Sequence, residues 1–120
     1  MGKNDHLGEF EQLALLAVLR LGERAYGAAI QEELDRTAGR SSAISSIYIT
    51  LTRLEAKGLV RSSLGTPPGS DEAGAEETRS RAGKPRRYFA IEPEGIEALK
   101  ASRETLLSMW DGVEHELETV

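Results

Sequence analysis

Residues 44–64, which read ISSIYITLTRLEAKGLVRSSL, decide the fold of this chain. Four apolar side chains in this stretch recur at spacings of three, four and three, the period of a single buried helix face: Ile44, Ile47, Leu51 and Leu54. We therefore predict a helix over residues 43–57, with Ser42 as its N-cap and Gly58 at its end. Residues 59–64 then form a strand.

The opposite face of this helix is small and hydroxylic, and it carries no acid. At about 100° per residue, the following side chains share it: Ser45, Ile49, Thr52, Arg53 and Ala56, flanked by Ser46 and Tyr48. A helix that binds a protein would present an apolar or acidic face instead. Ile49 is the one large aliphatic residue of this face, and it suits either a protein partner or the methyl group of a thymine.

Two further helices precede this stretch. Residues 9–21 are apolar on nearly every face, so we expect a helix that is buried almost all round and ends at Gly22. A shorter helix begins at Tyr26-Gly27 and runs to about residue 37, and Gly39 ends it.

A second strand over residues 87–91 pairs with residues 59–64. The intervening residues 65–83 are rich in Gly, Pro, Ser and Glu, which indicates a flexible, acidic tip. Three helices followed by two strands form a winged helix-turn-helix, a mainly α fold with a two-stranded wing. We assign residues 1–91 to this DNA-binding domain.

The charge distribution agrees with DNA binding. The 120 residues carry a net charge of −5, yet two blocks are basic. Residues 36–61 contain Arg36, Arg40, Arg53, Lys57 and Arg61 against one acid, and residues 79–91 contain Arg79, Arg81, Lys84, Arg86 and Arg87 against none. Basic side chains neutralise phosphates and release counterions, so these blocks predict the footprint on DNA.

The last helix is expected to run from Pro93 to about residue 118, within a dimerisation segment over residues 92–120. Its apolar residues follow a three-four repeat: Ile96, Leu99, Leu106, Trp110, Val113 and Leu117. A terminal helix has too little of its own chain to cover such a stripe. The sequence therefore predicts a homodimer.

Several classes of protein are excluded. The chain has no cysteine, and its two histidines, His6 and His115, lie at opposite ends, so we expect no metal site and no cofactor. No nucleophile–base group and no glycine-rich phosphate loop is present, which argues against an enzyme. The longest apolar run, residues 13–19, is too short to span a membrane. We expect a soluble, cytoplasmic protein.

Four motifs resemble the PadR-type transcriptional regulators. Residues 26–30, Tyr-Gly-Ala-Ala-Ile, are similar to the family's Tyr-Gly-x-x-Ile. Residues 47–60 match its Tyr-x-x-Leu-x-Arg-Leu-Glu-x-x-Gly-Leu core, residues 87–95 resemble its wing strand and following turn, and residues 109–111 resemble the C-terminal helix of its short members. The resemblance implies a bacterial homodimeric repressor that binds an inverted-repeat operator and is released by a small-molecule effector. Ser45 and Glu92 depart from the family's usual Gly and Thr.

The resemblance also implies site residues. The expected DNA contacts are Ser45, Ser46, Tyr48, Thr52 and Arg53 on the helix and Lys84, Arg86 and Arg87 on the wing. Arg53 suits either a phosphate or a guanine edge, and Tyr48 suits either DNA contact or packing. Trp110 suits either the dimer core or a planar effector. A winged-helix module that binds protein instead of DNA is the alternative function.

Overall fold

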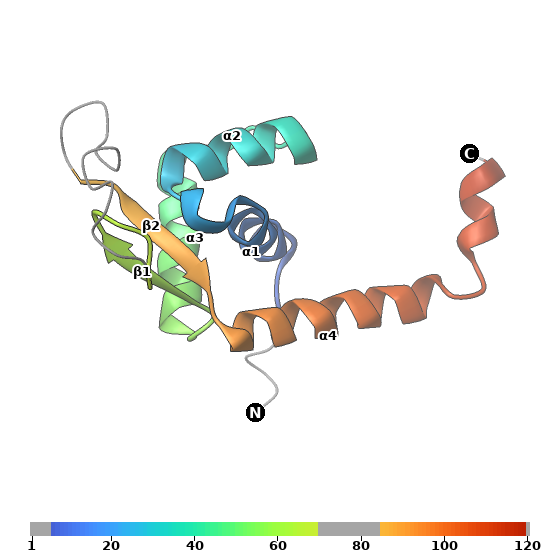
Figure 1. The fold of residues 1–120 in the computed structure, drawn as a ribbon. Coiled ribbons are helices and arrows are strands. Elements are labelled where there is room, and N and C mark those ends of the chain that lie inside the picture. The colour runs from blue at the N-terminus through green and yellow to red at the C-terminus, as the bar shows by residue number, and fades with distance from the viewer. Residues whose placement is uncertain (1–5, 70–84, 120) are drawn as a thin grey trace.

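The computed structural model describes residues 6–69 and 85–119 of the chain (Figure 1). Its elements in chain order are α1 (Glu9–Leu21), the 3₁₀ turn η2 (Gly22–Arg24), α2 (Gly27–Ala38), α3 (Ile44–Ala56), β1 (Val60–Leu64), β2 (Arg87–Ile91), α4 (Pro93–Trp110) and the 3₁₀ turn η4 (Glu114–Thr119). The predicted order of helices and strands is confirmed, and the fold is mainly α with a two-stranded wing.

The wing is an antiparallel pair in which Val60 lies opposite Ile91 and Leu64 lies opposite Arg87. An isolated bridge between Tyr26 and Tyr88 and a hydrogen bond from the Phe89 N–H to the Ala25 carbonyl (2.8 Å) attach β2 to the start of α2. The wing is therefore hydrogen-bonded to the helices as well as packed on them.

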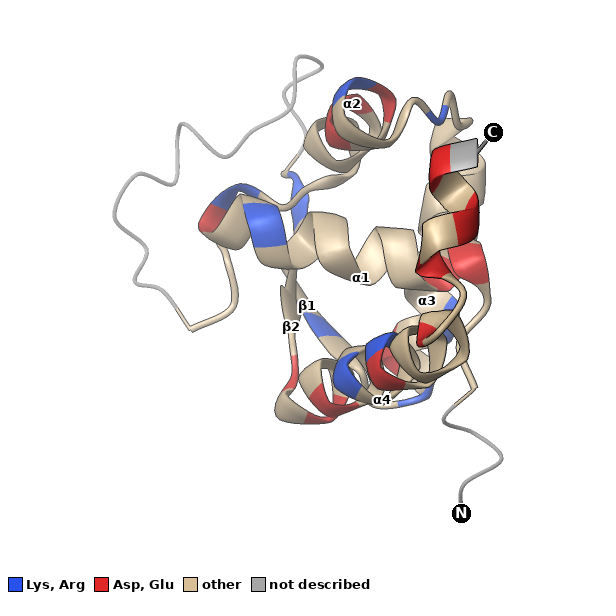
Figure 2. Ribbon diagram, turned by 90° about the vertical axis from the view of Figure 1, so that its right-hand side faces the viewer, with Lys and Arg blue, Asp and Glu red and all other residues tan. Residues whose placement is uncertain are grey.

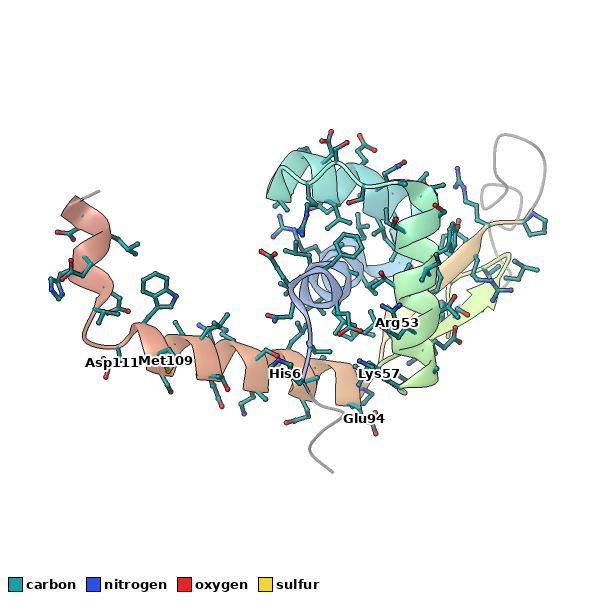
Figure 3. The ribbon with its side chains drawn as sticks, turned by 180° about the vertical axis from the view of Figure 1, so that it is seen from behind. His6, Arg53, Lys57, Glu94, Met109 and Asp111 are labelled. Carbon is teal, nitrogen blue, oxygen red and sulfur yellow. The ribbon has the colours of Figure 1, made fainter. Side chains whose placement is uncertain are left out.

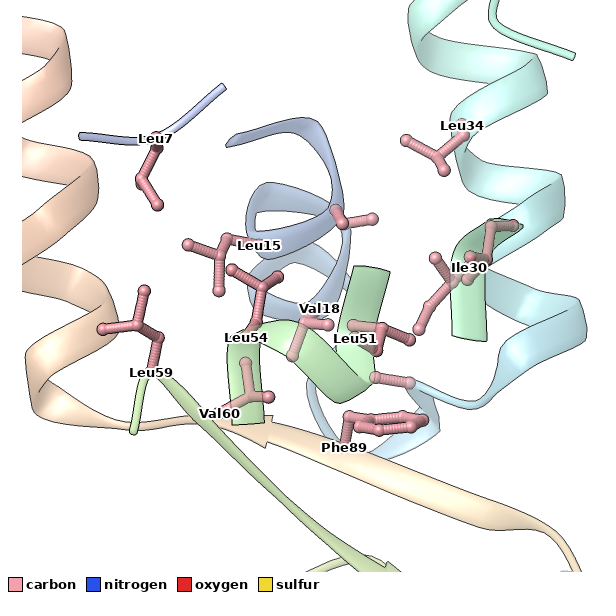
Figure 4. Close-up of a cluster of buried hydrophobic side chains, with 14 of the residues drawn as sticks. Leu7, Leu15, Val18, Ile30, Leu34, Leu51, Leu54, Leu59, Val60 and Phe89 are labelled. Atoms are coloured by element: carbon pink, nitrogen blue, oxygen red, sulfur yellow. The ribbon is translucent and has the colours of Figure 1, made fainter. Parts of the chain in front are cut away.

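One apolar core joins α1, α2, α3 and the sheet (Figure 4). Its fully buried large side chains are Leu15, Val18, Ile30, Ile47, Leu51, Leu54 and Val60. Three of the four residues predicted to face inward from residues 43–57 belong to this core.

Three local predictions were wrong. Ile44 is exposed because it is the first residue of α3 and lies about one turn before Ile47, the first core residue of that helix. The N-cap of α3 is Ala43, and Ser42 instead accepts a hydrogen bond at its carbonyl from Gln31 Nε2 (2.8 Å). Helix α1 is not buried all round, since Leu16 and Leu19 are exposed on the side that the other elements of the chain leave open.

The last helix is shorter than predicted. It ends at Trp110, and Gly112 at φ +89° turns the chain before η4 begins, so residues 93–118 do not form one helix. Only Gly95 and Ala98 of α4 are buried, and the helix projects away from the three-helix body (Figure 1).

Gly95 lets α4 start close to the sheet. A Cβ atom there would lie 2.4 Å from the Leu59 carbonyl oxygen and 2.7 Å from Ile91 Cγ1. Any larger residue would push α4 away from the body.

Within residues 6–69 and 85–119, no helix has both the length and the apolarity to cross a membrane. Most of the predicted flexible acidic tip, residues 65–83, lies outside the described part of the chain, as does Lys84.

Candidate nucleic-acid interface

The outward face of α3 carries the residues that the sequence predicted there. Ser45, Ser46, Thr52 and Arg53 are all exposed, and Ile49 lies among them. Figure 3 labels Arg53 on α3 and Lys57, the C-cap residue directly after this helix. The helix-turn-helix pairs α3 with α2, and this face of α3 is the one that such a motif presents to the major groove.

The only acid of α3 is held against the wing. Glu55 accepts hydrogen bonds from the Ser62 backbone N–H (3.1 Å) and from Ser62 Oγ (3.0 Å to Oε1). Arg87 Nη1 lies 3.0 Å from the same Ser62 oxygen. This chain of contacts ties α3 to both wing strands and holds the carboxylate of Glu55 against the wing.

Most of the first basic block is neutralised within the chain. Its salt bridges are Arg36 with Glu33, Arg40 with Glu9 (3.5 Å), Lys57 with Glu11 (3.1 Å) and Arg61 with Glu92 (3.3 Å). Among the residues that the structure describes, Arg53 is the member of the block without a carboxylate at salt-bridge distance. Its charge is therefore available to a phosphate or a base edge.

The Lys57 pair also fixes α3 against α1. Although burial opposes it, hydrogen bonds from the Gly8 N–H (3.0 Å) and from Lys57 lower the pKa of Glu11. Glu11 thus caps the first turn of α1 and anchors the end of α3 with one carboxylate.

Tyr48 packs inside the motif. Its ring centroid lies 6.2 Å from that of Phe89, and a Cβ atom at Gly27 would lie 2.5 Å from the Tyr48 hydroxyl oxygen. The Tyr-Gly pair at the start of α2 therefore leaves space for this ring. The packing interpretation of Tyr48 has direct support, although the side chain remains 36% exposed.

On the wing, the Arg86 guanidinium carbon lies 4.1 Å from the ring centroid of Tyr26. That ring in turn meets Tyr88 edge to face at 5.5 Å. Arg86 thus stacks on this aromatic pair directly before β2, and the exposed Arg87 is the first residue of the strand.

The apolar stripe of the C-terminal segment is largely uncovered by its own chain. Its exposed members are Ile96, Leu106, Trp110, Val113 and Leu117. Leu99 differs, because it is partly buried and packs against the core. Acidic residues, coloured red in Figure 2, lie along η4, so this end of the chain carries the charge that DNA repels.

The comparisons with known proteins fit this geometry. Residues 15–101 match the transcriptional regulator PadR-like family, which is more than half of the chain. The chain belongs to the PadR-like family. Its members are transcriptional regulators, so the chain is a DNA-binding regulator of the winged-helix class. No curated protein sequence matches the chain.

Solved structures of similar fold include a PadR family transcriptional regulator from Eggerthella lenta, at 29% identity and TM-score 0.61 over 93% of this chain and 88% of that one. A transcriptional regulator from Clostridium thermocellum is 20% identical, with TM-score 0.63 over 88% and 89%. A PadR-like regulator from Bacillus cereus is 21% identical, with TM-score 0.60 over 92% and 88%. The last two identities show the shared fold alone.

The sequence did not reveal one cluster within this PadR-like fold. Glu33 is buried on α2, where Arg20 Nε (2.6 Å), Thr37 Oγ1 (2.7 Å) and Arg36 all donate to it. The bonds from Thr37 and Arg20 lower the pKa of Glu33 from 4.5 to about 2. The spacing of Glu33 and Arg36 signals a helical pair, but nothing in the sequence links Arg20 to them.

Proposed function

We propose that the protein is a homodimeric repressor that binds an inverted-repeat operator in the cytoplasm, with no catalytic activity of its own. Residues 1–91 form the DNA-binding domain, and residues 92–120 hold the two subunits at the half-site spacing. Each subunit places α3 in the major groove of one half-site, about one turn of DNA from the other. The residues proposed to contact DNA are Ser45, Ser46, Tyr48, Thr52, Arg53, Lys84, Arg86 and Arg87.

The outward face of α3 is the observation that carries this proposal. It presents hydroxyl groups and the guanidinium of Arg53, which has no carboxylate at salt-bridge distance among the described residues. The only acid of α3, Glu55, is bonded to Ser62. Hydroxyl and guanidinium groups are donors that phosphates and base edges accept.

The proposal for a dimer rests on two exposed apolar surfaces. One is the stripe of the C-terminal segment, and the other is the open side of α1, which exposes Leu16 and Leu19. The last helix of one subunit, packed on the last and first helices of its partner, would cover both. Burial of this area supplies the free energy of association.

Binding of a small molecule at Trp110 would connect an effector to repression. This residue lies at the end of α4, directly before the turn at Gly112. A planar guest stacked on Trp110 would change how the two last helices pack, and with it the spacing of the two α3 helices. Quenching of tryptophan fluorescence by planar compounds, together with loss of DNA binding, would test this route.

Fluorescence anisotropy tests the function itself. Purified protein is titrated onto labelled DNA from upstream of its own gene and onto a scrambled duplex, across a salt series. We expect saturable binding to the first duplex that weakens as salt rises, because counterions are released on binding. Arg53→Ala should weaken it strongly, whereas Lys100→Ala removes an equal charge from α4 and should not.

A protein-binding module is the second candidate, and exposed Ile49 is the observation that favours it. Absence of binding to either duplex even at low salt would replace the DNA-binding proposal with this one. Equal, weak binding to both duplexes would place the operator elsewhere in the genome.

A further inference from the structure

We propose that Ile49 is a specificity-determining residue, which selects a thymine in each half-site by contact with its C5 methyl group. The inference rests on the proposed DNA binding by α3 and adds to it the base that one residue recognises. It concerns a side chain that the charge and hydrogen-bond arguments above leave without a role.

The exposure of Ile49 is unusual for its element. Its exposed fraction is 59%, against 39% for Ile44 and 36% for Tyr48, while Ile47 is fully buried. Ile44 is exposed because it begins the helix, and Tyr48 is exposed only beyond its packing against Phe89. Ile49 lies in the middle of α3 and belongs to neither case.

The neighbours of Ile49 are those of a DNA-reading surface. One turn before it lie Ser45 and Ser46, and one turn after it lie Thr52 and Arg53. Residues at these spacings share a helix face. The sec-butyl group of Ile49 therefore lies at the centre of these four residues, whose side chains carry a hydroxyl group or a charge.

The major groove offers one apolar group that such a side chain can bury. Each base pair presents donors and acceptors there, and only thymine adds a methyl group. An apolar contact with cytosine would instead cover an amino donor without replacing its hydrogen bond to water, which costs free energy. Ile49 is thus suited to favour thymine and to disfavour cytosine at one position.

The size of the expected effect follows from the size of the group. Burial of one methyl-sized group stabilises a complex by about 0.8 kcal/mol, which corresponds to about a fourfold change in affinity. Removing the methyl group from one half-site should therefore weaken binding about fourfold.

Deoxyuridine substitution removes only this methyl group and leaves base pairing intact. A duplex is first enriched from a random pool by the wild-type protein, and each of its thymines is then replaced singly by deoxyuridine. We expect one position in each half-site where the wild-type affinity falls about fourfold. With Ile49→Ala, replacement at that position should leave the affinity unchanged.

Leu64→Ala is the matched control, because Leu64 is an equally exposed aliphatic residue on β1. This variant should keep the full loss at the same position, and Ile49→Val should keep part of it. Alanine is a stronger helix former than isoleucine, so Ile49→Ala should fold, and thermal melting checks this.

Three results would overturn the inference. Wild-type binding that ignores deoxyuridine at every position excludes a methyl contact. An undiminished loss with Ile49→Ala assigns the contact to another residue. Failure of the wild-type protein to enrich any duplex overturns the proposed DNA binding as well, and this separates the two failures.

Discussion

The two ends of the molecule differ in what they can bury within one chain. The body, formed by α1, α2, α3 and the wing, encloses a continuous core in which Leu15, Ile47 and Leu54 have no exposed surface. The distal half of α4 and the following η4 leave almost every apolar residue exposed, including Leu106 and Leu117. The chain thus combines a body with a buried apolar core and a C-terminal segment whose apolar residues remain exposed.

This difference separates apolar residues that are buried within the chain from apolar residues that require a partner chain. In the body, the recurring apolar residues are covered by the helices and strands of the same chain. In the C-terminal segment the same recurrence has no cover, and exposed apolar surface of this extent marks an interaction site. Substitutions in the two regions should therefore report on different equilibria.

The largest effect is expected from Leu54→Ala in the body. Leu54 on α3 is fully buried in the apolar core, so its truncation leaves a cavity and should reduce the free energy of unfolding by about 2–5 kcal/mol. Chemical denaturation measures it. Leu107→Ala, an exposed position on α4, is the control in the other region and should change the unfolding of the body little.

A smaller loss is expected from Gly95→Ala, at the junction of the two regions. The added Cβ atom would collide with the Leu59 carbonyl and with Ile91, at a cost of about 1–3 kcal/mol of unfolding free energy. Glu97→Ala, exposed on the same helix, should stay within about 0.5 kcal/mol of the wild-type value. Equal melting curves for both variants would mean that α4 does not start as close to the sheet as the structure places it.

In the C-terminal region, Trp110→Ala should weaken self-association by about 2 kcal/mol, or roughly 30-fold, while the body stays folded. Sedimentation equilibrium over a dilution series measures it, and circular dichroism checks the fold. Met109→Ala tests whether self-association depends on the residues of the predicted repeat. Met109 is more exposed than Trp110 but does not belong to that repeat. Equal effects of the two variants would contradict the predicted stripe.

The smallest effect is a pH dependence of stability that arises from the buried carboxylate of Glu33. The folded pKa of Glu33, about 2, lies below its ordinary 4.5, so its ionised form stabilises the fold above pH 4.5. That stabilisation should decline as the pH falls from about 4.5 toward 2. Glu33→Gln should flatten this decline in thermal melting, whereas Glu32→Gln, at an exposed neighbouring position, should keep it.

Much of the body could be predicted because its signals are local. Helix α1 and strand β2 have the bounds expected from the sequence, and α3 differs by one residue at each end. Apolar period, glycine at helix ends and strand alternation all act within a few residues. The face of α3 could be assigned for the same reason.

The errors arose where distant parts of the chain decide the outcome. Ser42 is a good N-cap by type, yet its carbonyl is engaged by Gln31 and the helix begins without it. The last helix was expected to continue to about residue 118, but α4 ends at Trp110 and Gly112 turns the chain with a positive φ. The Glu33 cluster depends on Arg20, which lies 13 residues away on another helix.

The candidate site was predictable in its residue types but not in its charge balance. When charges are counted along the sequence, the five cations of the first basic block, residues 36–61, are equivalent. In the structure, four of them pair with carboxylates of α1, α2 or the N-cap of α4. Arg53 became distinct only when the tertiary contacts were known.

Sedimentation velocity of the protein mixed with its enriched duplex measures both DNA binding and the number of chains that bind together. We expect one complex that contains two chains per duplex, and we expect Arg53→Ala and Trp110→Ala each to weaken it. A complex of one chain per duplex, or free protein and free duplex at low salt, would contradict this expectation.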